Sequence, residues 1–275
     1  MAMRVARSVE RVVGSVWQAE GRGARVRRSI GRAELAELDP FLLLDEFEGS
    51  RKDGAGFPDH PHRGFETVTY VLEGEMTHED FKGNHGVIRA GDLQWMTAGR
   101  GVMHSEMPGW ETTRGLQLWV NLARKQKMVE PSYQELTASE VPVGRSPGVE
   151  VRVVAGTALG TTSPVRTLTP TSYLDFTLQP GAAHQQPLPA DWNTFIYVLM
   201  GSFRFAGKLV NAHSTVVFKQ DGEVVEMENV GEEQGRLVMV AGRPLGEPVA
   251  RRGPFVMSTK EEIEQAVKDF TRCEE

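Results

Sequence analysis

Short apolar runs separated by turn residues dominate the pattern of this chain. Runs such as GLQLWVNL (115–122), VEVRVVAG (149–156) and SYLDFTLQPG (172–181) are bounded by some of its 29 glycines and 15 prolines. Closely spaced strands and turns without long helices between them are typical of sandwiches and barrels, whereas a parallel α/β sheet needs crossover helices. The pattern therefore predicts an all-β protein.

The N-terminal stretch has a mixed pattern. Its valines between residues 5 and 16 follow helical spacing, but valine itself favours strands, so we expect a strand there. A short helix is expected from Arg32 to Leu38, because Asp39-Pro40 would stop it.

One longer helix is predicted near the C-terminus, over about residues 259–272. Ser258 followed by Glu261 is a capping-box pattern. The apolar positions that then recur on one helical face are Ile263, Val267 and Phe270. Such a helix would pack its apolar face on a barrel.

An internal repeat suggests two similar domains. The segment YVLEG at 70–74 recurs as YVLMG at 197–201, although two short strand-turn segments can also agree by chance. The length of 275 residues corresponds to roughly two domains at about 150 residues each. We expect an N-terminal barrel over 1–135 and a C-terminal barrel over 136–275.

Two short motifs have the spacing of a metal site. His60-Pro-His62 and His104-Ser-Glu106 each place two side chains at positions i and i+2, which project from the same face of a strand. Three imidazoles and one carboxylate suit iron, manganese, copper, nickel or zinc. A lone HxH is more often a surface or hydrogen-bonded pair, but the second motif favours a metal.

The fourth ligand has two candidates. Glu106 pairs directly with His104, while Glu66 shares strand parity with His60 and His62 if the strand runs unbroken past Gly64. Two further histidines, His78 in THED and His85 in GNHG, lie in a polar hairpin, where surface positions are expected.

The second copy of the repeat lacks this pattern. Superposing the copies without gaps places Pro187 and Pro189 at the positions of His60 and His62, and the nearest histidine is His184. We therefore expect metal in the first barrel and not in the second.

Charge and composition narrow the function classes. The net charge of -6 argues against a globally basic nucleic-acid binder, and no P-loop, Rossmann or zinc-finger motif is present. No apolar run approaches the roughly 20 residues of a membrane span. The single cysteine, Cys273, can form no internal disulfide, which fits a reducing compartment. One local basic cluster could be a solvated face or a partner site: Arg22, Arg25, Arg27, Arg28 and Arg32.

Several longer segments resemble the pirin family. They are DPFLLLDEFEG (39–49), GFPDHPHRGFETVTYVLEGE (56–75), GDLQWMTAGRGVMHSEMP (91–108), LQLWVNL (116–122) and GPFVMST (253–259). The resemblance implies a protein of the cupin superfamily, with two tandem antiparallel jelly-roll barrels and a C-terminal helix. It also implies iron held by His60, His62, His104 and Glu106, and so selects Glu106 over Glu66.

Two activities are implied by the resemblance. One is a quercetin 2,3-dioxygenase that opens a flavonol ring with O2 and releases carbon monoxide. Glu106 would then act as general base, and Phe57, Phe65, Trp95 and Met103 could line the substrate site. The other is an iron-dependent, redox-sensitive transcription co-regulator that binds partners such as NF-kappaB, with the arginine cluster as contact surface. We expect a monomer in the cytoplasm and also in the nucleus.

Overall fold

Two compact units make up the chain, for which the computed structural model describes residues 4–274, with side chains up to residue 272. Barrel A comprises Trp17–Gly31, Pro40–Ala138 and Leu245–Glu275, and barrel B comprises Met1–Val16, Arg32–Asp39 and Ser139–Pro244. The side chain of Cys273 lies outside the described part. Among the described residues we find no helix with the length and apolar character needed to cross a membrane.

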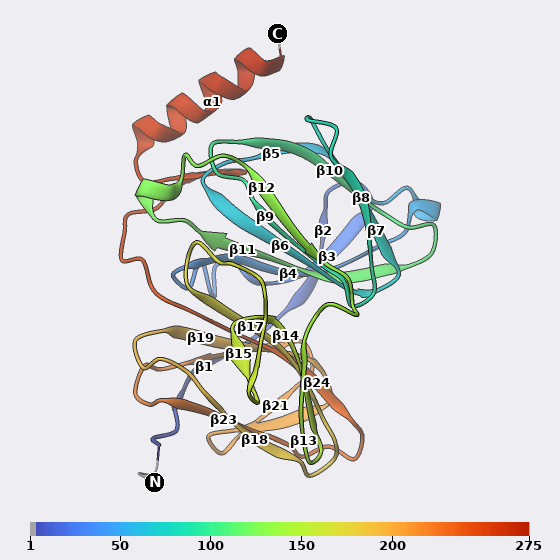
Figure 1. The fold of residues 1–275 in the computed structure, drawn as a ribbon, viewed down its shortest axis with the longest axis vertical. Helices are drawn as coiled ribbons and strands as arrows, with labels where there is room; N and C mark the ends of the chain where they lie inside the picture. Colours follow the sequence, from blue (N-terminus) through green and yellow to red (C-terminus); the bar gives the residue numbers. More distant parts are fainter. Residues whose placement is uncertain (1–3, 275) are drawn as a thin grey trace. The chain divides into compact units, whose positions relative to one another are not determined.

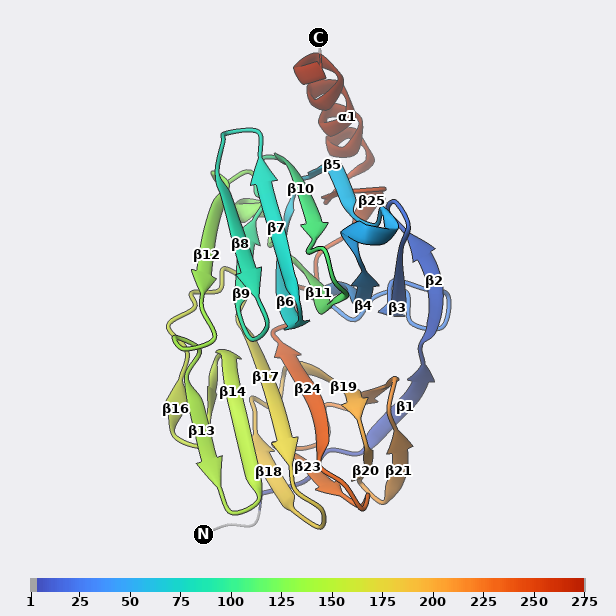
Figure 2. The ribbon, with the colours of Figure 1, turned by 90° about the vertical axis from the view of Figure 1, so that its right-hand side faces the viewer.

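Barrel A consists of two antiparallel sheets (Figures 1 and 2). Its seven-stranded sheet has the order β12 (Ser132–Leu136), β9 (Leu93–Thr97), β6 (Phe65–Glu73), β11 (Thr113–Asn121), β4 (Phe41–Gly49), β3 (Ala24–Ile30), β2 (Val16–Glu20). Its four-stranded sheet has the order β5 (Phe57–His62), β10 (Val102–Pro108), β7 (Glu75–Asp80), β8 (His85–Arg89). Two 3-10 turns, η1 (Arg51–Asp53) and η2 (Arg124–Gln126), connect strands.

Barrel B repeats this arrangement. Its larger sheet has the order β1 (Val9–Gly14), β22 (Ser214–Phe218), β19 (Asn193–Met200), β24 (Gly235–Gly242), β17 (Thr171–Leu178), β14 (Val149–Ala155), β13 (Val143–Ser146). The smaller sheet has the order β18 (Ala183–Pro187), β23 (Val224–Asn229), β20 (Ser202–Phe205), β21 (Lys208–Asn211). A small hairpin is formed by β15 (Thr157–Ala158) and β16 (Thr161–Thr162). The repeated YVL segments lie in β6 and β19, which are central strands of the two larger sheets. The all-β prediction is confirmed.

The units differ from the expected bounds 1–135 and 136–275 at both ends of the chain. The N-terminal strand β1 pairs with β22, so the predicted strand near the N-terminus is confirmed but belongs to barrel B. The last segment, from Leu245, belongs to barrel A, where β26 (Phe255–Met257) pairs with β25 (Ala250–Arg252). Pairing between distant strands, and not sequence position, decides where each terminus folds.

Of the two predicted helices, the one at 32–38 does not form, and the one near the C-terminus forms with a different cap. Residues 32–38 form a bridged turn instead of a helix. The C-terminal helix α1 (Lys260–Glu274) forms as expected, but its cap is Thr259 and not Ser258. The Thr259 hydroxyl accepts from Glu262 N (3.2 Å), and Glu262 Oε2 accepts from Thr259 N (3.1 Å). This reciprocal pair is a capping box shifted by one residue.

The apolar face of α1 packs as expected on the strand hairpin next to it. Ile263 is buried in a cluster with Phe255 and Met257, and Val267 and Phe270 pack against this cluster. Figure 2 shows α1 continuing beyond β25 and β5. The helix therefore fastens the C-terminal segment to barrel A.

Gly64 has no substitute at the turn between β5 and β6. Its φ is 89°, and a Cβ there would collide with the backbone oxygen of Val256. Gly54 also has a positive φ, 74°, but open space around it. Gly54→Ala should cost about 1–2 kcal/mol through backbone strain alone. Gly64→Ala should cost at least about 2 kcal/mol more, because the collision is added. Urea unfolding of both variants tests this, and equal losses would contradict it.

Candidate metal centre

Two neighbouring strands of barrel A bring the three motif histidines together. His60 and His62 lie on β5, and His104 lies on β10, where it pairs directly with His60. Their ligand nitrogens lie within 4.8 Å of one another, and the three ring centroids are 4.5–5.0 Å apart. The expected convergence of the histidines is thus present in the geometry.

The environment keeps the imidazoles of His62 and His104 neutral, which is the form that binds metal. Burial lowers the pKa of His62 well below its usual value, and the nearby His104 and His60 lower it further. Burial also lowers the pKa of His104 to about 4, although the carboxylate of Glu106 opposes this shift. Both residues are almost fully buried, and none of the described residues is a hydrogen-bond partner of either His104 ring nitrogen.

One of the three histidines has the orienting acceptor that we expect for a metal ligand. His60 Nδ1 donates to the carbonyl of Pro58 at 2.9 Å, which leaves Nε2 available. The His62 ring packs edge-on against Phe65 and Trp119, with centroids 5.2 and 5.1 Å apart. Aromatic packing therefore fixes His62.

The Glu106 carboxylate is buried and held by the larger sheet. Thr69 Oγ1 on β6 donates to Oε1 at 2.7 Å, and Gln117 Nε2 on β11 donates to Oε1 at 3.2 Å and Oε2 at 3.0 Å. The group of mutually close ligand atoms contains the three histidines and not Glu106. The role of Glu106 as fourth ligand therefore remains a prediction. Glu106 does line the same cavity as His60 and His62.

Glu66 does not share the face of the motif histidines. The strand is broken at Gly64, because β5 ends at His62 and β6 begins at Phe65. Phe65 and Thr69 face the site, so Glu66 points to the other face of the sheet. There it accepts a hydrogen bond from Thr97 Oγ1 at 2.8 Å, and burial raises its pKa to about 7. The condition for an inward-pointing Glu66, a strand that runs unbroken past Gly64, is therefore not met.

A cavity of about 590 Å³ opens beside His60, His62 and Glu106. This size is typical of small-molecule sites. The apolar part of its lining consists of Val26, Leu43, Phe47, Phe57, Pro58, Met76, Trp119 and Pro254. Of the four expected wall residues, Phe57 lines the cavity, while Phe65 packs behind His62 and Trp119. Trp95 and Met103 are not among the lining residues.

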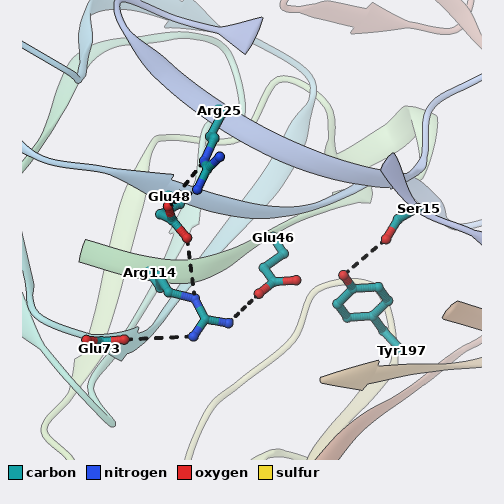
Figure 3. A network of polar contacts seen from close by, with 7 residues as sticks. All are labelled: Ser15, Arg25, Glu46, Glu48, Glu73, Arg114 and Tyr197. Atoms are coloured by element: carbon teal, nitrogen blue, oxygen red, sulfur yellow. Dashed lines mark hydrogen bonds and ion pairs between the residues drawn. The ribbon is translucent and has the colours of Figure 1, made fainter. Parts of the chain in front are cut away.

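The arginine cluster does not form one uniform basic surface. Arg25 pairs with Glu48 at 2.5 Å, as Figure 3 shows beside the contacts of Arg114 with Glu46, Glu48 and Glu73. Three of the five cluster arginines are paired with carboxylates: Arg25, Arg28 and Arg32. Arg22 and Arg28 line the cavity, and Arg32 belongs to barrel B.

Several residues near the site escaped the motif analysis. His78 is buried, contrary to the expected surface position, and its Nε2 lies 2.9 Å from Glu135 Oε1, whereas His85 is exposed as expected. The alternation Met76, His78, Asp80 along β7 could have indicated its inward direction. Thr69 and Gln117 carried no sequence signal, because their role depends on pairing between distant strands.

Comparison with known proteins agrees with this architecture. The family model described as Pirin matches residues 23–120, and the one described as Pirin C-terminal cupin domain matches residues 173–274. The chain belongs to the pirin family. It is 56% identical to Pirin of Homo sapiens over 92% of this chain and 88% of that protein. It is 54% identical to Pirin-like protein 2 of Arabidopsis thaliana, over 97% and 84%.

A solved structure shows the same fold at high similarity. The crystal structure of quercetin 2,3-dioxygenase from Acinetobacter baumannii superposes with a TM-score of 0.89 at 33% identity, covering 98% of both chains. Both units are therefore cupin-type barrels, as expected for this pirin-family member.

In barrel B, the strands that correspond to β5 and β10 are β18 and β23. His184 is the one histidine on β18, and β23 has none. Val225 and Met227 of β23 belong instead to the apolar core of barrel B. Apolar packing thus occupies the interior where barrel A has its histidines.

Metal affinity should distinguish the two glutamates. Glu106→Gln should weaken Fe(II) binding at least about tenfold, because it removes the carboxylate nearest the histidines. Glu66→Gln, a matched change on the opposite face of the sheet, should leave binding unchanged. Anaerobic titration of both variants measures this. Loss of affinity in Glu66→Gln alone would reverse the assignment.

Glu66 should also produce a pH-dependent stability. Its pKa is about 7 in the folded state and 4.5 for an ordinary glutamate, so the folded protein holds a proton that the unfolded chain releases. The free energy of unfolding therefore falls as pH rises through this window. Glu66→Gln should gain stability relative to the wild type between pH 5 and 8, by at most about 3 kcal/mol. Urea unfolding at several pH values measures it; a pH-independent difference would contradict the shift.

Proposed function

We propose that the protein is a metal-dependent dioxygenase of the quercetin 2,3-dioxygenase type. The observation that carries this proposal is the cavity, which joins His60, His62 and Glu106 to mainly apolar walls. Its volume suits a flavonol-sized aromatic compound. The similarity to a solved quercetin 2,3-dioxygenase at 33% identity supports the same reaction class.

The residues present fit a bound metal ion. His60, His62 and His104 would hold it, and Glu106 is the proposed fourth ligand. Three neutral nitrogen donors with a carboxylate suit iron, which we propose as the metal, and also suit manganese, copper, nickel or zinc. When bound, the metal supplies Lewis acidity and a centre at which O2 chemistry is possible.

The side chains of barrel A have separate tasks in this proposal. Glu106 accepts the proton of the flavonol 3-hydroxyl, while the donors of Thr69 and Gln117 keep its carboxylate oriented. Trp119 and the other apolar wall residues contact the rings of the substrate and exclude water. The negative charge that forms on the 3-oxygen of the substrate therefore lies at the end of the cavity that contains Glu106 and the histidines.

The co-regulator hypothesis receives less support from the surface. Its expected contact, the arginine cluster, has three members paired with carboxylates of this chain. The likeness to human Pirin keeps this function as the alternative proposal. Equal partner binding by the Fe(II) and Fe(III) forms would count against it.

Oxygen consumption tests the dioxygenase. The protein loaded with iron, manganese or copper should consume O2 with quercetin and release an equal amount of carbon monoxide. His104→Ala should abolish this activity, because it removes a central imidazole, whereas His85→Ala, a change at an exposed histidine, should retain it. Absence of oxygen uptake with all three metals would refute the proposal.

A further inference from the structure

A continuous row of polar side chains crosses the larger sheet of barrel A. Each strand contributes one residue, in the spatial order Glu135, Gln94, Thr69, Gln117, Asp45, Arg28, Glu20. Neighbouring members from Glu135 to Arg28 are direct cross-strand partners. Glu20 joins the row through its ion pair with Arg28, at 2.7 Å. Because cross-strand partners share a face, the row lies on the face that carries the site.

The Glu106 carboxylate contacts the middle of this row. Thr69 and Gln117 in its middle bind that carboxylate. From Gln117 the row continues through Asp45 and Arg28 to Glu20, and all four of these residues line the cavity. Arg28 lies two strands from Gln117, which corresponds to about 10 Å. The cavity thus has a metal-ligand end and a separate charged end.

The charged end is an acceptor-rich surface. Arg28 donates to both oxygens of Asp45, at 2.9 and 2.7 Å, and to Glu20 Oε2, at 2.7 Å. The two carboxylates offer more acceptor positions than the donors of Arg28 occupy, so some of their lone pairs can accept further hydrogen bonds. The Asp45 side chain is only 7% exposed and lines the cavity, so a hydroxyl inside the cavity can donate to the acceptor positions that remain on its oxygens.

Two further cations, Arg22 and Arg251, line the cavity, and Arg251 interacts electrostatically with Asp45. Arg251 lies over the ring of Trp119, 5.0 Å from its centroid, and donates to the carbonyl of Leu42. Arg22 is exposed and pairs through its backbone with Gly56. Because the carboxylate oxygens of the charged end accept hydrogen bonds, a neutral donor such as a phenolic hydroxyl fits this end.

We propose that Glu20, Arg28 and Asp45 determine substrate specificity by binding hydroxyl groups on the pendant phenyl ring of a flavonol-type substrate. The substrate class is then a polyhydroxylated aromatic compound with an oxygen at the metal end and ring hydroxyls at the other. This inference rests on the proposed aromatic substrate. It adds a recognition site on β2, β3 and β4, strands that carry none of the motif histidines.

Binding without turnover tests the inference. Dissociation constants for quercetin and for galangin, a flavonol without hydroxyls on the pendant phenyl ring, are measured anaerobically by titration calorimetry with the zinc-loaded protein. The wild type should prefer quercetin at least about tenfold, because galangin lacks the hydroxyls that would donate to Asp45 and Glu20. Asp45→Asn and Glu20→Gln should each reduce this ratio several-fold.

A change on the same strand provides the matched control. Glu48 lies on β4 like Asp45, pairs with Arg25, and does not line the cavity. Glu48→Gln should keep the preference of the wild type. If Asp45→Asn fails to fold, Glu20→Gln carries the test, because the Glu20 side chain is 40% exposed. Equal affinities of the wild type for both flavonols, or a ratio unchanged in the folded variants, would overturn the inference. Preferential binding without oxygen uptake would uphold it and refute only the dioxygenase.

Discussion

The break between β5 and β6 is the constraint on which the rest of the site depends. Gly64 turns the chain with a positive φ and brings its backbone against Val256 of the C-terminal hairpin. The buried Lys127 ammonium holds this junction, since it donates to the carbonyls of Gly64 and Val256 and to Asn121. Burial lowers the pKa of Lys127 to about 8, so it still carries its charge at neutral pH. The strand that bears His60 and His62 is therefore positioned by three carbonyl-type acceptors around one cation.

The same turn separates the roles of two buried glutamates. Before Gly64 the histidines face the cavity, and after it the facing residues are Phe65 and Thr69, so Glu66 is directed away. Glu106 arrives from the opposing sheet and meets three hydrogen-bond donations from Thr69 and Gln117. These donors fix the orientation of the Glu106 carboxylate. Glu106 thus lines the cavity with His60 and His62, whereas burial on the other face of the sheet raises the pKa of Glu66 to about 7.

The sequence pattern predicted those features that depend only on residues close together in the chain. The i, i+2 spacing of His60 and His62 was readable because it survives in any strand, and so was the apolar face of α1. The cap was misplaced by one residue because Thr259 and Glu262 satisfy the same pattern as Ser258 and Glu261. The cavity position of Arg28 was unreadable, because it requires the register of β3 against β4 and of β4 against β11. Likewise, the pairing of β1 with β22 joins residues about 200 positions apart, beyond the reach of any window.

The assignment of the C-terminal segment to barrel A has a consequence for synthesis of the chain. Arg251, Gly253 and Pro254 complete the cavity lining, and Val256 completes the acceptors of Lys127. During translation, residues 139–244 leave the ribosome before this segment does. Barrel A therefore lacks part of its cavity lining and one acceptor of Lys127 until residues 251–256 have been synthesised. Closure of the cavity around a metal or an aromatic ligand consequently follows the synthesis of residues 139–244 of barrel B.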